Sequence, residues 1–344
     1  MKKALSVILV IALILSCNTG NKKNIIEPIS LKDTIFVKPE ILKIDKLLPG
    51  ILNLKIRDSI LILTSFDGKG SILLFNKING KYISTKCLNG RGPGEFSTNI
   101  EFKTIVDSIY IYESSKNLLS IYKSDTFLYD SISQADKKLK PEKDPNYIDV
   151  FPLNGYYVSR PGVNARFSLF NRNGKHISDY ELFPDYFKDV NSINQKFELR
   201  RYYAVEPKPD LSKFVALSHI GGIMEIFKVE KDSINIILKK IFLNPELKVE
   251  EKKGLIQEDT KIGFFGLYTT DNYIYASYSG LAAKDFRKLK SLEFITVFDW
   301  KGKLKRVYKV EGGLTALAAD EAEGKIYVVT KDSEGVDAVG VIKM

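Results

Sequence analysis

The chain has 344 residues, a formal net charge of +10, two histidines and two cysteines. Two histidines and the absence of a Cys-x-x-Cys spacing exclude the common zinc sites. The lysine excess is spread along the chain and does not form the basic block typical of nucleic-acid binding. Aromatic residues make up 11% of the chain, with 18 Tyr and 20 Phe, and this composition favours strands over helices.

The first sixteen residues have the pattern of an export signal. Lys2 and Lys3 precede the apolar run 4–15, which at about 1.5 Å per residue is too short to cross the roughly 30 Å core of a membrane. The run Ile14-Leu15-Ser16-Cys17 resembles the lipobox of bacterial lipoproteins and implies acylation of Cys17, with palmitate as the type of lipid. The alternative is an ordinary secretory signal followed by a chance cysteine.

The remainder divides into a tether and one folded domain. Residues 17–30 are predicted to be the lipidated Cys17 and a flexible tether, and residues 31–344 the folded domain, with no transmembrane segment. We expect lipid attachment to the outer membrane. Because no acidic run follows Cys17, the periplasmic face is favoured, with surface display as the alternative. Only Cys87 then remains as a thiol, so we expect no intramolecular disulfide, and we expect a monomer.

A strand that follows a short polar turn recurs six times along the chain. Its first apolar residue is Ile60, Ile109, Tyr156, Phe214, Tyr273 or Ile326, so the copies lie 47 to 59 residues apart. A second strand follows five of the copies, and three of these lead into turns at Gly80, Gly174 and Gly302, where tight hairpins require positive φ. A period near fifty with four strands per unit predicts an all-β fold, a six-bladed β-propeller with four-stranded antiparallel blades. An irregular β-sandwich or two stacked domains is the alternative.

The two ends of the chain are expected to meet in the last blade. The sixth unit has only three strands before the chain reaches Met344. The run Asp33-Thr-Ile-Phe-Val37 has strand character and no other partner. We therefore expect residues 33–37 to supply the fourth strand of the last blade and to close the ring.

The run Leu88-Asn-Gly-Arg-Gly-Pro-Gly-Glu-Phe96 lies between the first and second units. It resembles the six-bladed, TolB-like β-propeller lipoproteins of Bacteroidota, where this run typically follows the first blade. The resemblance implies a fold and an envelope location, and it implies no activity. We expect Gly90, Gly92 and Gly94 to let the backbone turn through left-handed conformations, so that the run forms a rigid crossover between the first two blades. The alternative is a ligand site, in which consecutive N–H groups converge on an anion and Arg91 and Glu95 face it or each other.

The blade-to-blade crossovers and the loops after the second strands of a propeller open on one face. We expect the ligand-binding residues there, namely Arg91, Glu95, Arg160, Arg166, Arg200, Arg201, Tyr202 and His219. Arginine suits carboxylates, sulfates or phosphates, and tyrosine rings suit sugar faces or peptide side chains. In the alternative interpretation, Arg200 and Arg201 pair with Glu198 and Glu206 in a solvated loop. Tyr202 and Tyr203 are expected to alternate in direction along an extended chain, so at most one of them points into the mouth.

These features predict a noncatalytic, membrane-tethered binding or scaffold protein. Its expected partner is an anionic glycan, a peptide or a protein, without a cofactor and without nucleic acid. The alternative is a propeller hydrolase or lyase in which Glu95, Asn164 and Asp271 hold calcium, although these residues share no spacing. A Ser-His-Asp triad is not expected, because no Gly-x-Ser-x-Gly elbow is present.

Overall fold

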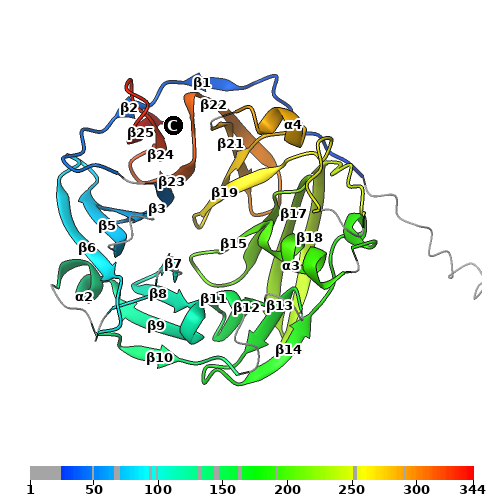
Figure 1. Cartoon of the computed structure of the whole chain (residues 1–344), viewed down its shortest axis with the longest axis horizontal. Coiled ribbons are helices and arrows are strands. Elements are labelled where there is room, and N and C mark those ends of the chain that lie inside the picture. Colours follow the sequence, from blue (N-terminus) through cyan, green and yellow to red (C-terminus); the bar gives the residue numbers. More distant parts are fainter. Residues whose placement is uncertain are drawn as a thin grey trace, which may run out of the picture.

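Six β-sheets form a closed ring in the computed structural model (Figure 1). The structure describes residues 25–344 apart from 49, 66–69, 93–94, 98–99, 131–133, 143–146, 162–164, 191, 251–253 and 290. The predicted signal, Cys17 and the tether up to residue 24 lie outside the described residues. The predicted six-bladed propeller is confirmed, because each sheet contains four antiparallel strands and a short strand from the N-terminal segment completes the last sheet. One sheet carries a fifth, parallel strand.

Blades 1 to 3 occupy the first half of the ring. Their strands are β3 (Ile51–Arg57), β4 (Ile60–Ser65), β5 (Gly70–Asn76) and β6 (Tyr82–Leu88); β7 (Ile100–Ile105), β8 (Ser108–Glu113), β9 (Leu118–Lys123) and β10 (Lys137–Leu139); and β11 (Tyr147–Leu153), β12 (Tyr156–Pro161), β13 (Phe167–Phe170) and β14 (His176–Tyr180). Two short helices, η1 (Ser114–Lys116) and α2 (Ser124–Tyr129), flank β9 in blade 2.

Blades 4 to 6 complete the ring. Their strands are β15 (Tyr203–Pro207), β16 (Phe214–Ser218), β17 (Gly222–Glu230) and β18 (Ser233–Leu243); β19 (Phe264–Thr269), β20 (Tyr273–Tyr278), β21 (Leu292–Asp299) and β22 (Leu304–Leu314); and β23 (Ala316–Asp320), β24 (Lys325–Lys331) and β25 (Asp337–Lys343) with β2 (Glu40–Ile41). The first strand of each blade is the innermost, and the inner strands contact one another around a central channel (Figure 1).

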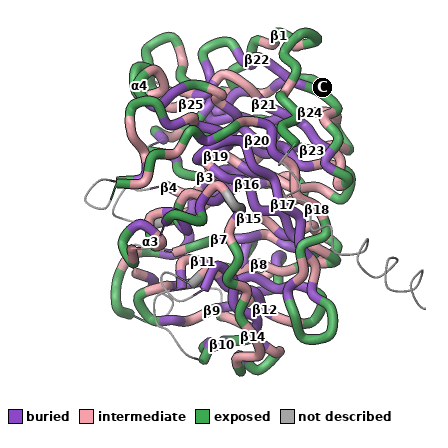
Figure 2. The backbone as a smooth tube through the Cα atoms, turned by 90° about the vertical axis from the view of Figure 1, so that its right-hand side faces the viewer, coloured by how far each residue is buried: buried purple, intermediate pink, exposed green. Residues whose placement is uncertain are grey.

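The second strand of each blade is apolar on both faces because a neighbouring blade covers each face. In β4, Ile60 and Ile62 pack with blade 2, whereas Leu61 and Leu63 pack with blade 6. Each such side chain contributes about 1.5–3 kcal/mol when fully buried. The buried residues accordingly run through the middle of the blades, and the exposed ones lie mainly in the loops (Figure 2).

The N-terminal segment closes the ring, but the predicted closing strand is wrong. Residues 35–37 form β1 (Ile35–Val37), which pairs in parallel with β22 as a fifth strand of blade 5. Blade 6 is completed by β2, which pairs antiparallel with β25, and the Leu42 N–H donates to the Val339 carbonyl at 2.8 Å. Pro39 separates the two strands: proline has no N–H to donate, so the ladder is interrupted there and the chain passes to the next blade.

The chain before β1 continues the same path around the rim. Ile26 forms a parallel bridge with Ile241 of β18, and the Glu27 N–H donates to the Ile241 carbonyl at 2.8 Å. The segment 26–42 therefore crosses the outer edges of blades 4, 5 and 6, which we call the rim strap (Figure 1). None of the helices among the described residues is long and apolar enough to span a membrane.

Two local predictions have different outcomes. The hairpin glycines are confirmed, since Gly80, Gly174 and Gly302 have φ of 71°, 81° and 71°. The crossover between blades 3 and 4 is not extended as expected, because it contains η2 (Asp185–Phe187) and α3 (Ile193–Arg201). Ser192 caps α3, and its Oγ accepts from the Gln195 N–H at 3.2 Å.

Candidate functional site

The crossovers and the loops after the second strands open on one face, as expected, and we call it the crossover face. His219, in the loop after β16, donates its N–H to the carbonyl of Tyr202 in the preceding crossover at 2.7 Å. The Gly221 N–H donates to Lys261 of the following crossover at 2.7 Å. The opposite face carries the tight turns between first and second strands and between third and fourth strands, and we call it the hairpin face.

Two hollows lie in the central channel. The hollow towards the crossover face, the mouth pocket, has a volume of about 170 Å³ and is bordered by Glu101, Arg160 and Phe265 among others. The hollow towards the hairpin face has about 150 Å³. Glu206 borders both, so it marks the depth at which they meet.

An ion-pair cluster lies at this depth and joins four blades. Lys55 of β3 lies 2.8 Å from Glu206 of β15, measured from Nζ to Oε1. Lys103 of β7 lies 3.3 Å from the same oxygen and 3.1 Å from Oδ2 of Asp149 on β11. Lys55, Lys103 and Asp149 are at most 5% exposed. A buried charge is tolerated only with a partner, so this cluster ties four inner strands together.

The opposite charges in the cluster favour the charged forms of Glu206 and Lys103. Burial alone would raise the pKa of Glu206, but Lys103 and Lys55 lower it overall. Burial would lower the pKa of Lys103, but Asp149 and Glu206 raise it overall. The Lys103 Nζ also donates to the Val205 carbonyl at 3.0 Å.

Glu101 borders the mouth pocket, nearer the crossover face than the ion-pair cluster, and it differs from the cluster in its pKa. It lies two residues before Lys103 on β7, and water reaches its side chain through the channel. The channel walls remove part of the water around the carboxyl group and so disfavour its charged form. This loss of hydration and the negative charge of Asp149 raise the pKa of Glu101 to about 7, although the positive charges of Arg160 and Lys103 act to lower it. Its carboxyl group therefore gains and loses a proton near neutral pH.

Arg160 of β12 reaches across the same pocket. Its NH1 donates to the carbonyl of Tyr203 at 2.7 Å, and its NH2 lies 3.8 Å from Oδ2 of Asp149. Its Nε has no hydrogen-bond partner among the described residues. The guanidinium is thus held in place from one side and retains a donor for a further acceptor.

Three stacked rings stand beside Arg160. The ring of Phe265 on β19 lies between His219, at a centroid distance of 4.7 Å, and Phe286 of α4 (Ala283–Phe286), at 5.0 Å. Burial and the charge of Arg160 lower the pKa of His219 to about 3. His219 is therefore neutral near pH 7 and acts as an aromatic ring in this stack.

Of the predicted site residues, Arg160 and His219 come together at the mouth, and Arg166 does not. Arg166 is 3% exposed and pairs with Glu225. The rings of Tyr203 and Phe227 lie 4.5 and 5.4 Å from its guanidinium carbon. This side chain lies within the packing between blades 3 and 4.

The helical crossover also places its residues differently from the expected loop. Arg200 is buried over the ring of Phe183, and Arg201 is exposed over the ring of Phe197. The Tyr202 hydroxyl donates to Glu198 at 3.1 Å, and the ring of Tyr202 lies 6.2 Å from that of His219. The alternative pairing of these arginines with Glu206 is not found, because Glu206 pairs with Lys55 and Lys103 in the channel, at 2.8 and 3.3 Å.

The glycine-rich run forms a compact loop whose carboxylate points inwards. Oε2 of Glu95 accepts from the Gly92 N–H at 2.6 Å, and a Cβ on Gly90 would lie 1.9 Å from the same oxygen. Gly90 and Gly92 do not adopt the expected left-handed conformation, and Gly94 lies outside the described residues. Space for Glu95, not positive φ, is what Gly90 provides, while Arg91 is exposed.

The proposed calcium ligands are not brought together. Asp271 lies in the turn between β19 and β20, on the hairpin face, 3.8 Å from Lys208. Glu95 lies in a crossover, on the other face, and Asn164 is outside the described residues. Within the described ranges no group of three or more His, Cys, Asp or Glu residues is arranged to hold a metal ion.

Sequence reasoning missed the ion-pair cluster and Glu101. All of these residues lie on first strands, where a charged residue alternates with apolar ones, as in Glu101-Phe102-Lys103. That alternation is also typical of a strand with one solvated face. The useful signal was position, since the first strand of every blade lines the channel.

Comparison with known proteins supports the fold. A family model described as TolB-like 6-blade propeller-like matches residues 38–322. A predicted exported protein of Bacteroides fragilis is similar in structure, with a TM-score of 0.61 and 12% identity over 92% of this chain and 98% of that one. The β-propeller domain of Cps50 (Swd1) from Myceliophthora thermophila matches with a TM-score of 0.49 and 7% identity, over 88% of this chain and 99% of that one. No match is found among curated proteins. The likeness to the Bacteroides fragilis protein shows the fold alone.

Proposed function

Because the chain belongs to the TolB-like six-bladed propeller family, we propose that it is a noncatalytic binding protein of the cell envelope whose mouth pocket holds an anionic group of its ligand. The observation that carries this proposal is Arg160, a channel cation fixed by the Tyr203 carbonyl with its Nε left without a partner among the described residues. An incoming carboxylate would supply the missing acceptor.

The size of the pocket restricts what enters it. A volume of about 170 Å³ is below the roughly 300 Å³ at which pockets for whole small molecules begin. The ion-pair cluster lies beneath it, and Phe265 borders it. One terminal group of a longer ligand therefore fits, such as an acidic residue of a peptide or protein or an acidic end unit of a glycan.

Glu101 couples this binding to pH. An anion beside Arg160 also lies near Glu101, so it is repelled when Glu101 is ionised. Since the pKa of Glu101 is about 7, binding is expected to be tighter at pH 6 than at pH 8. Replacing Glu101 with Gln should remove most of this difference.

An array of peptides and glycans tests the proposal. Each compound is presented as the free carboxylate and as its amide or methyl ester, and the whole protein is applied at pH 6 and pH 8. We expect binding to carboxylate forms only, lost in Arg160→Gln and retained in Arg172→Gln, an exposed control in the turn between β13 and β14 on the hairpin face. Equal binding to both forms, or unchanged binding by a folded Arg160→Gln protein, would contradict the proposal.

We further propose that acylated Cys17 holds the protein on the outer membrane, with the propeller on the periplasmic side. Support comes from the lipobox-like run before Cys17 and from the structural likeness to a predicted exported protein. Two or three acyl chains would give an essentially permanent anchor, since each buried CH₂ contributes about 0.8 kcal/mol. Cys17→Ser should abolish labelling by a fatty-acid analogue; persistent labelling would show that another residue carries the lipid.

A further inference from the structure

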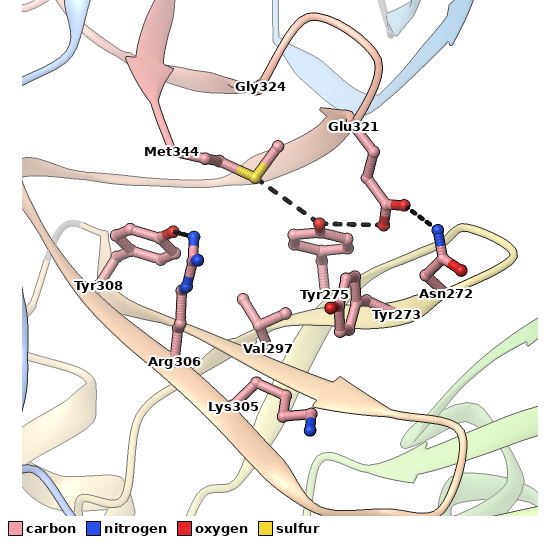
Figure 3. Close-up of a pocket in the computed structure, with 10 residues that line it drawn as sticks. All are labelled: Asn272, Tyr273, Tyr275, Val297, Lys305, Arg306, Tyr308, Glu321, Gly324 and Met344. Atoms are coloured by element: carbon pink, nitrogen blue, oxygen red, sulfur yellow. Dashed lines mark hydrogen bonds between the residues drawn. The ribbon is translucent and has the colours of Figure 1, made fainter.

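A second pocket lies on the hairpin face, between blades 5 and 6, and is separate from the channel. It has a volume of about 370 Å³, within the range of pockets that hold whole small ligands. Blade 5 supplies its tyrosine wall and Arg306, and blade 6 supplies Glu321 and the chain end at Met344 (Figure 3). None of the residues expected to bind a ligand lies here.

The rim of this pocket is fixed by hydrogen bonds between the two blades. Glu321, in the turn between β23 and β24, accepts from Nδ2 of Asn272 at 2.8 Å and from the Tyr275 hydroxyl at 3.1 Å. It also accepts from the Thr270 hydroxyl. Three donors thus satisfy the Glu321 carboxylate, so the pocket is preformed and its one acid is already engaged.

Tyrosine rings form the apolar part of the wall. Tyr273 and Tyr275 lie on the same side of β20, with ring centroids 6.3 Å apart and an interplanar angle of 83°. Tyr308 of β22 completes the wall and is 1% exposed. Tyr275 and Tyr308 are almost fully buried and support the half-buried Tyr273. The ring of Tyr273 offers an apolar face with a hydroxyl group at its edge, a combination that suits the C–H face and hydroxyls of a sugar.

Arg306 supplies an uncompensated positive charge. Its NH1 donates to the Tyr308 hydroxyl at 3.2 Å, which orients the guanidinium beside the pocket (Figure 3). No carboxylate of the described chain lies within ion-pair distance of it, whereas the neighbouring Lys305 pairs with Asp299 at 3.4 Å. One edge of the guanidinium therefore remains available for a bidentate contact with a carboxylate.

We propose that the pocket between blades 5 and 6 binds one carboxylated sugar unit, with its carboxylate on Arg306 and its ring against the tyrosine wall. The shared chemistry is that of a uronic acid, either free or at the end of a glycan chain. This site is on the face opposite the mouth pocket and shares no residue with it, so the two proposals stand independently.

The test uses the whole protein with sodium glucuronate, sodium galacturonate, a short oligouronate, and glucose as the neutral analogue. Ligand binding is measured by saturation-transfer NMR titration. We expect uronate binding at least tenfold tighter than glucose binding, weakened at least tenfold in Arg306→Gln and reduced in Tyr273→Leu. Arg287→Gln, an exposed arginine on the crossover face, is the matched control and should bind as the wild type does.

Each result decides the proposal. Binding of the monosaccharides supports a free ligand, and binding of the oligouronate alone supports a glycan end, provided that Arg306→Gln weakens it. No binding of any uronate, equal binding of glucose, or full binding by Arg306→Gln with an unchanged melting temperature overturns the proposal. Loss of uronate binding in Arg160→Gln but not in Arg306→Gln would place the sugar in the channel and would also overturn it.

Discussion

Replacing Glu101 with Gln should stabilise the protein at alkaline pH and leave its stability unchanged at acid pH. The pKa of Glu101 rises from an ordinary 4.5 to about 7 in the folded protein. A rise of this size corresponds to about 3 kcal/mol for a fully buried group. Water reaches Glu101 through the channel and screens it, so about 1 kcal/mol is the expected effect.

The sign follows from proton binding. The folded protein holds the Glu101 proton more tightly than the unfolded chain does, so folding is favoured at low pH and loses this contribution as the pH rises from 4.5 through 7. Glutamine resembles the protonated carboxyl at every pH. The variant should therefore match the wild type near pH 4.5 and exceed it above pH 7.

Thermal unfolding at pH 4.5, 6 and 8 measures the difference. An effect of about 1 kcal/mol should raise the Tm of Glu101→Gln by about 1–3 °C at pH 8. Glu334→Gln, an exposed glutamate in the turn before β25, is the control and should show no pH-dependent difference. A Glu101→Gln advantage that is the same at all three pH values, or a loss of stability at pH 8, would refute the electrostatic reasoning.

Three further perturbations probe the cluster, the crossover loop and the rim strap. Lys103→Met removes the lysine that pairs with Asp149 and should lower the free energy of unfolding in urea by about 3–5 kcal/mol. The exposed control Lys138→Met should lower it by less than about 0.5 kcal/mol. A small loss for both variants would show that the cluster is not essential for stability. Gly90→Ala should lower the free energy of unfolding by about 1–2 kcal/mol, because its Cβ displaces the carboxylate of Glu95. This loss should be smaller when Glu95 is also replaced with Ala. Additive losses in the double variant would exclude this contact. A chain that begins at residue 38 should keep a closed ring with a slightly lower Tm, whereas one that begins at residue 46 lacks β2 and should unfold at a much lower temperature, so equal Tm values would contradict the assigned closure.

The blades could be predicted from the sequence because their second strands are apolar on both faces. A run such as Ile60-Leu-Ile-Leu63 can be buried only between two other sheets, and its sixfold recurrence sets the number of blades. The closing strand could not be predicted in the same way. The strand pattern of residues 35–37 is compatible with pairing on blade 5 and with pairing on blade 6, and in the structure these residues pair in parallel with blade 5. The true closing strand has only two residues, Glu40 and Ile41, too few to show a pattern in the sequence.

Only part of the candidate site was accessible to sequence reasoning. Arg160 and His219 were identified because the order of strands assigns each loop to a face. Arg166 was placed wrongly, because a residue at the start of a strand can point either to the mouth or between two blades. The ion pair with Glu225 holds Arg166 between blades 3 and 4. The partners of Lys103 lie 46 and 103 residues away, and one sequence gives no indication of such a pairing.

The rim strap also determines how a pull on the protein is distributed. Tension that arrives from the N-terminal side first reaches the backbone contacts of Ile26 on blade 4 and then the parallel ladder of β1 on blade 5. The two-residue strand β2 comes last in this series. The short strand that closes the ring therefore bears this tension only after the two earlier attachments have given way.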